Sequence, residues 1–267
     1  MKTLIIILLP QSTLYSQTFL LQEIKKDNTS FEFKFQHPFF DYDNGVSALT
    51  GIYELSAGIR ISDKIDLKFE IPITHISFEN IPGETEIGNI FLGIQARLGE
   101  SLKKNESFSA GIFISSAAQD FSTVLYGIFI SPLDMQKYLS NELTIFSNYS
   151  IFKKFNNNFK LNGEIGPNIY IYTGKGNSNA ELYLHFGFSP GFYFSRFFIN
   201  TELAELFAVT ADSDVDFSDR FINCLAAGFG WEGDIVRPRI FYTYTFNEFM
   251  SRISDGTLGL KLEVILP

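Results

Sequence analysis

Hydrophobic and polar residues alternate one by one along most of the chain beyond residue 30. In Phe31–Gln36 the phenylalanines take every odd position, and Glu32, Lys34 and Gln36 take the even ones. The stretch DLKFEIPITHIS, Asp66–Ser77, repeats this alternation. Successive residues of a strand point to opposite faces, so the pattern predicts strands with one apolar and one polar face. Helical spacing of apolar residues is hard to find.

The alternation recurs in a series of segments, and we expect about twelve strands of the length that a tilted membrane-spanning strand requires. The predicted strands lie near Phe31–Gln36, Tyr53–Ile61, Asp66–Ser77, Asn89–Leu98, Phe108–Ser116, Glu142–Phe152, Phe159–Tyr172, Glu181–Phe194, Phe197–Phe207, Phe221–Trp231, Val236–Phe246 and Leu258–Leu266.

The connections between these segments alternate in length. Short ones, such as Ser62–Lys64 and Ser195–Arg196, alternate with longer ones, such as His37–Thr50 and Gln119–Asn141. Short turns at one end and long loops at the other are typical of outer-membrane barrels. The sequence therefore predicts an all-β fold, an up-and-down antiparallel transmembrane β-barrel of about 12 strands.

A soluble β-sandwich would alternate too, with its charged face toward water and its apolar face in a core. The segments here are long, and their apolar positions are rich in Leu, Ile and Phe. Tyr or Trp lies near several strand ends, at Tyr53, Tyr149, Tyr172 and Trp231. This placement suits an aromatic girdle at a membrane interface, so the pattern favours the membrane barrel.

The first residues, MKTLIIILLPQSTLYSQ, resemble a secretory signal: Lys2 precedes an apolar run from Leu4 to Leu9, and small or polar residues follow. We expect residues 1–16 to be a signal peptide and residues 17–267 to form one outer-membrane barrel domain. Outer-membrane lipid and the barrel-assembly machinery are the expected partners. The last strand ends in Pro267 where such barrels usually carry an aromatic residue.

Composition narrows the function. The net charge of −9 argues against nucleic acid, which needs a basic face. Cys224, the single cysteine, has no partner in the chain for a disulfide. No glycine-rich nucleotide motif stands between a strand and a helix. We therefore expect no cofactor.

If the apolar face meets lipid, the polar face lines the lumen. Both charge signs occur there in similar numbers, which indicates cross-strand ion pairs and weak ion selectivity. The expected lumen-lining residues are Glu32, Lys34, Glu54, Arg60, Asp66, Lys68, Glu70, Arg97, Glu164, His185, Arg237 and Arg239. Two interpretations stay open: a lumen plugged by its own side chains, and a pathway for small solutes.

Acidic residues gather in one predicted external loop, ADSDVDFSD. Asp212, Asp214 and Asp216 alternate there, as the first ligands of a calcium loop do, but the glycine and the final glutamate of such a loop are missing. We interpret the segment as a solvated acidic loop and expect no metal.

The segment EIGNIFLGIQARL is similar to a strand early in the barrel of the phenol meta-pathway transporter-like outer-membrane proteins. The matching positions are Gly88, Asn89, Leu92, Gly93 and Gln95. This resemblance would cover most of the chain after the signal. It implies a channel for hydrophobic solutes.

His75 and Ser77 share the apolar face of their strand, and His-x-Ser resembles the catalytic pair of two outer-membrane lipid hydrolases, phospholipase A and the lipid A deacylases. Glu86 or Asn89 on the next strand would orient the histidine. Those enzymes continue with Asn and a small residue, whereas Phe78 and Glu79 follow here. We therefore expect no enzyme. The sequence predicts a passive channel, with a plugged structural or surface-interaction barrel as the alternative and the hydrolase as a minor one.

Overall fold

The computed structural model describes residues 19–21, 29–40, 46–79, 81–101, 104–117, 121–156, 158–174, 179–211, 215–246 and 254–266. Its strands are β1 Ser30–Phe40, β2 Gly51–Arg60, β3 Ile65–Phe78, β4 Ile81–Ile87, β5 Ile90–Glu100, β6 Lys104–Ile114, β7 Glu142–Lys154, β8 Phe159–Tyr172, β9 Ala180–Phe194, β10 Phe197–Ala208, β11 Phe221–Trp231, β12 Val236–Thr245 and β13 Ser254–Ile265. The helices are α1 Phe121–Ile130 and the 3₁₀ turns η1 Pro132–Lys137 and η2 Phe217–Arg220.

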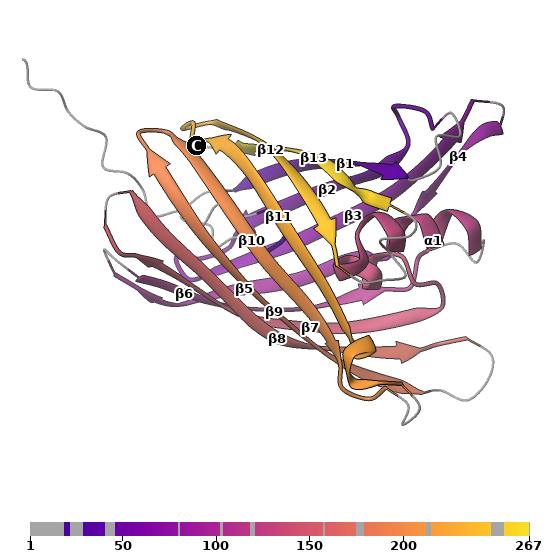
Figure 1. Cartoon of the computed structure of the whole chain (residues 1–267). Coiled ribbons are helices and arrows are strands. Elements are labelled where there is room, and N and C mark those ends of the chain that lie inside the picture. Colours follow the sequence, from indigo (N-terminus) through magenta and orange to yellow (C-terminus); the bar gives the residue numbers. More distant parts are fainter. Residues whose placement is uncertain are drawn as a thin grey trace, which may run out of the picture.

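The strands form one closed antiparallel barrel of 12 strand positions, which confirms the predicted fold (Figure 1). Apart from β4 and β5, which do not pair with each other, each strand pairs with its neighbours in sequence, and β1 pairs with β13 to close the wall. The strand β3 pairs with β5 along its first half and with β4 along its second half. The strands β4 and β5 therefore share a single position in the wall.

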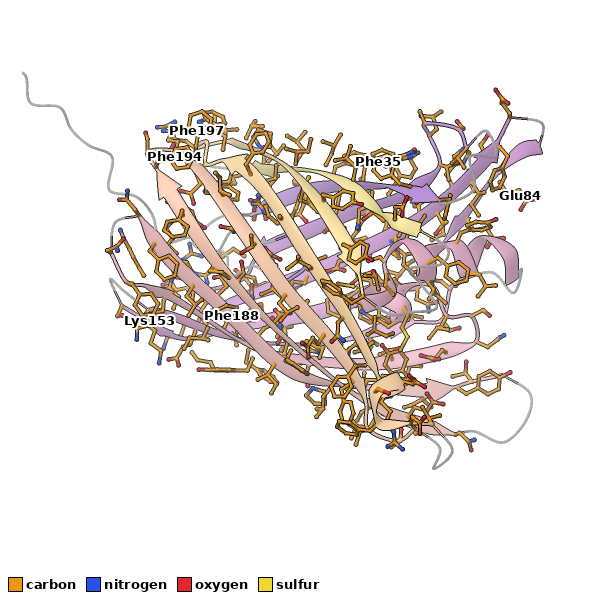
Figure 2. The ribbon with its side chains drawn as sticks, in the orientation of Figure 1. Phe35, Glu84, Lys153, Phe188, Phe194 and Phe197 are labelled. Carbon is orange, nitrogen blue, oxygen red and sulfur yellow. The ribbon has the colours of Figure 1, made fainter. Side chains whose placement is uncertain are left out.

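The outside of the barrel is apolar. Along β10 the burial alternates residue by residue, and the exposed set includes Ile199 and Leu203. Figure 2 shows Phe188, Phe194 and Phe197 on the outer surface, and each is about half exposed. Charged side chains such as Glu202 and Lys160 face inward and are buried. This polarity is the reverse of that of a soluble barrel and is what a lipid-facing wall requires.

The two ends of the barrel differ, as the connection lengths predict. Lys153, beside a short turn, and Glu84, on the hairpin of β3 and β4, lie at opposite ends in Figure 2. The sequence predicts a loop between the strands Asp66–Ser77 and Asn89–Leu98, but β3 continues to Phe78 and the strand β4 follows. That prediction is wrong because β4 carries Pro82 and Gly83, which weaken a strand signal in sequence.

The connection between β6 and β7 enters the lumen. Its helix α1 packs against β1, β2, β3 and β13, and η1 contacts β10 and β11 across the barrel. The sequence expects no helix there because α1, FSTVLYGIFI, is apolar on every side and shows no 3.6-residue period. None of the helices in the described ranges is long and apolar enough to span a membrane.

Candidate functional site

The lumen contains an ordered set of ion pairs on β1, β2, β12 and β13. The register places Lys34 opposite Lys261 and Glu32 opposite Glu263, so like charges face each other across β1 and β13. Diagonal contacts compensate: the Lys261 ammonium lies 3.0 Å from a Glu32 carboxylate oxygen. Like charges directly opposite each other are unfavourable. The diagonal contact brings Lys261 to Glu32, a residue of opposite charge, and so replaces repulsion with attraction.

The same principle extends around the wall. Glu263 accepts a hydrogen bond from Arg239 at 3.0 Å and lies 3.5 Å from Arg237. On β3 and β5, one guanidinium nitrogen of Arg97 donates to both oxygens of Asp66, each at 2.9 Å. These residues are buried or half-buried, so each charge has a partner, as burial demands.

The remaining predicted lumen residues fall into two groups. Arg60 lies at the short-turn end, where it pairs with Asp63. Five side chains border one central cavity, together with Glu32 and Lys34: Glu54, Lys68, Glu70, Glu164 and His185. The cavity has a volume of about 150 Å³.

The inserted turn η1 adds charges that the sequence did not place in the lumen. The Lys137 ammonium lies 2.5 Å from Glu54, 3.2 Å from Glu70 and 3.5 Å from Asp134. Asp134 lies in turn 3.7 Å from Lys34. Burial alone would lower the pKa of Lys137, but the carboxylates of Asp134, Glu54 and Glu70 outweigh it and raise that pKa well above its usual value.

Two further contacts hold η1 and the residue that follows it in place. The Tyr170 hydroxyl of β8 donates to the Gln136 side-chain oxygen at 3.0 Å. Tyr138 is buried in a cluster with Ile52, Ala117 and Ile130. Because η1 is bonded to β2 and β3 on one side and to β8 on the other, it crosses the lumen.

A second segment enters the lumen from the chain start. The backbone N–H groups of Phe19, Leu20 and Leu21 donate to the Glu202 carboxylate of β10 at 2.7, 2.8 and 3.3 Å. The Phe19 ring stacks on Phe241 at 5.1 Å. Consecutive N–H groups form a natural anion cradle, so a buried carboxylate here needs no cation.

Aromatic side chains form one side of the cavity between these two segments. Phe91, Phe113 and Phe146 come from β5, β6 and β7 and pack together. The His185 ring stacks on Phe146 at 5.2 Å, nearly parallel. Within the described part of the chain, neither ring nitrogen of His185 has a hydrogen-bond partner. The cavity thus has an aromatic side toward β5–β9 and a charged side toward β1, β2 and β13.

The hydrolase candidates lie apart from this cavity. The His75 ring nitrogen Nδ1 is 2.8 Å from the hydroxyl of Thr85, its cross-strand neighbour. Ser77 uses its backbone groups to bond Thr50. Glu86 pairs with Thr74, which is buried, and therefore faces the lumen while His75 faces outward. The structure does not bring Glu86 to His75.

The acidic loop is described only in part. Asp212 and Asp214 lie outside the described residues. Asp216 precedes η2, and its carbonyl accepts a hydrogen bond from the Asp219 N–H at 3.0 Å. Over the described ranges, no three His, Cys, Asp or Glu side chains gather closely enough to hold a metal ion. Cys224 is buried, with its sulfur 3.3 Å from the Thr245 hydroxyl.

No protein-family model matches the chain, and no curated protein matches its sequence. Solved structures do match. The COG4313 outer-membrane channel from Pseudomonas putida F1 has a TM-score of 0.64 at 10% identity, over 96% of this chain and 98% of that one. The KdgM porin has a TM-score of 0.54 at 8% identity, over 89% and 99%. The NanC porin has a TM-score of 0.55 at 7% identity, over 90% and 99%. These identities are too low to show more than a shared outer-membrane barrel fold.

Proposed function

We propose that this protein is a passive outer-membrane channel for small solutes. The observation that carries the proposal is the reversed polarity of the barrel: an apolar outer wall surrounds a lumen of charged and hydrogen-bonding side chains. A wall of this kind is stable only where lipid meets it. The similarity in fold to proteins described as channels and porins supports the same reading.

The lumen is narrow, so the solute is small. The segment Phe19–Leu21 and the turn η1 both border the cavity of about 150 Å³. Its aromatic side, Phe91, Phe113 and Phe146, favours solutes with an apolar part, whereas the opposite side is polar. The charges of the lumen have both signs and are paired, so we expect weak ion selectivity. The Gly88-Asn89 segment supports membership in the phenol meta-pathway transporter-like family.

We further propose that residues 1–16 direct export and are removed, and that the barrel faces outer-membrane lipid after insertion by the assembly machinery. The short turns would then lie in the periplasm and the end with α1 and η2 outside.

A second function follows from the same lumen. Two inserted segments fill much of the barrel, which favours a plugged barrel with a structural or surface-interaction role. Planar-bilayer recording of the folded, purified chain distinguishes the two. The channel predicts discrete single-channel currents of small amplitude. An electrically silent membrane that contains verified folded protein would leave the plugged barrel as the function.

A further inference from the structure

The barrel wall is interrupted between β4 and β5. Gly88 and Asn89 lie between these strands. The Gly88 N–H still donates to a wall carbonyl, that of Pro72 on β3, at 2.8 Å. The next N–H, that of Asn89, instead donates to the carbonyl of Lys137 in η1, at 2.6 Å. At Asn89 the backbone of the wall therefore bonds the inserted segment and not the neighbouring strand.

The Asn89 side chain continues this contact. It is fully buried, and its Nδ2 group donates to the carbonyls of Gln136 at 2.9 Å and Leu139 at 2.7 Å. Its Oδ1 atom accepts hydrogen bonds from the N–H groups of Ser116 and Ala117, both at 3.0 Å. One carboxamide therefore bonds both ends of the connection: the point where it leaves β6 and the point where it returns toward β7.

Residue chemistry restricts this position. The contact requires two donors and an oxygen with two acceptor sites in one short side chain, which is what a carboxamide supplies. The preceding residue is restricted as well. A Cβ atom at Gly88 would lie 2.2 Å from the Lys137 carbonyl oxygen, so only glycine lets the segment approach this closely. The pair Gly88-Asn89 is thus a binding surface for the inserted segment.

We propose that Asn89 is the positioning residue that holds α1 and η1 in the lumen and thereby keeps the channel narrow. The second half of this statement rests on the proposed channel function. The ion pairs of Lys137 attach only the end of η1, whereas Asn89 fixes the entry and the exit of the whole connection. The Asn89 carboxamide joins Ser116 and Ala117, at the start of the connection, to Gln136 and Leu139, near its end. Removal of this side chain breaks that link.

The test measures segment release and current separately. Leu133 of η1 borders the cavity. The variant Leu133→Cys, made in a Cys224→Ser background, carries a single thiol at this position. The rate at which this thiol reacts with a bulky maleimide measures how accessible η1 is. We expect Asn89→Ala to raise this rate on the order of tenfold or more, because four hydrogen bonds are lost. Single-channel conductance should rise in the same variant. A heat-dependent shift in electrophoretic mobility verifies folding.

Two further variants sharpen the result. Asn148→Ala is the matched control, since Asn148 is a buried lumenal asparagine that bonds Ser150 and Glu164 on the wall. It should leave the labelling rate unchanged. Asn89→Asp keeps the acceptors for Ser116 and Ala117 but places a carboxylate against the carbonyls of Gln136 and Leu139. It should also speed labelling, and it carries the test if Asn89→Ala does not fold.

Labelling at the wild-type rate in folded Asn89→Ala or Asn89→Asp overturns the proposal. An equal increase in Asn148→Ala overturns it too, because any lumenal asparagine would then have the same effect. Faster labelling of the Asn89 variants without current in any variant supports the positioning role and removes the channel function, so the two failures are distinguishable.

Discussion

The Lys137 ammonium nitrogen lies 2.5 Å from a carboxylate oxygen of Glu54 and joins the inserted turn to the barrel wall. The contact links a residue from the middle of the chain to a strand near its start. Glu70 and Asp134 complete the surroundings of the ammonium. Three carboxylates thus share one cation, and a second cation, Lys34, lies 3.7 Å from Glu54 and 3.7 Å from Asp134.

Replacing this cation should change ion selectivity. In Lys137→Met the side chain keeps its length, but Glu54, Glu70 and Asp134 lose their shared partner. We expect a larger conductance and a reversal potential shifted toward cations in a salt gradient, since the loss of one positive charge leaves excess negative charge in the lumen, and this attracts cations. The control is Lys104→Met, which removes a partly exposed lysine that pairs with Glu106 at the short-turn end. An unchanged reversal potential in Lys137→Met would contradict the assignment.

Alkaline pH offers a second test of the same ion pairs. The folded-state pKa of Lys137 is raised above its ordinary value of 10.5. Its stabilising effect is therefore complete below the ordinary value and is lost only as pH rises through the raised one. The labelling rate of Leu133→Cys, corrected for thiol ionisation, should stay constant from about pH 7 to about pH 10. A rise within that window would show that another group controls η1.

The N-terminal segment should depend on Glu202. In Glu202→Gln the carboxylate that accepts three backbone N–H groups becomes an amide with one oxygen, at a cost of roughly 2 kcal/mol for the docked segment. A thiol at Leu20→Cys, in the Cys224→Ser background, should then react faster with a maleimide. Glu164→Gln is the control, since Glu164 bonds Asn148 on the wall. Equal rates in the wild type and Glu202→Gln would argue against this contact.

Lipid contact can be measured through stability. Leu203, near the middle of β10, is partly exposed on the outer face. Leu203→Arg should lower the free energy of unfolding in lipid vesicles by about 2–4 kcal/mol, because an arginine at mid-membrane loses hydration. Phe217→Arg, at the long-loop end, should cost no more than about 1 kcal/mol. Urea titration measures both, and similar costs would place the membrane elsewhere.

The barrel was predictable because period-2 alternation is local. The apolar and polar faces of a strand can be read from that strand alone. The alternate apolar residues, such as Phe31 and Phe33, therefore predict the outer face of the barrel without knowledge of the neighbouring strands. The alternation of short and long connections then supplies the topology. The strand β4 was missed because a proline and a glycine interrupt its signal.

The contents of the lumen were not predictable in this way. Lys137 lies far from Glu54 and Glu70 in the sequence, and no local pattern near residue 137 predicts their contact. The helix α1 shows no period, and Phe19–Leu21 bond Glu202 through backbone groups that carry no sequence signal. Asn89 was visible as part of a motif, but its partners in the connection after β6 were not.

The pairing of β1 with β13 has a consequence for assembly order. This seam joins the two most distant strands in the sequence, and Glu32 and Lys34 on it face the space that holds the inserted segments. A closed cylinder of hydrogen-bonded strands offers no lateral entry to a bulky helix. We therefore expect α1 and η1 to fold onto the open sheet first. The pairing of β1 with β13 then closes the barrel around these two helices.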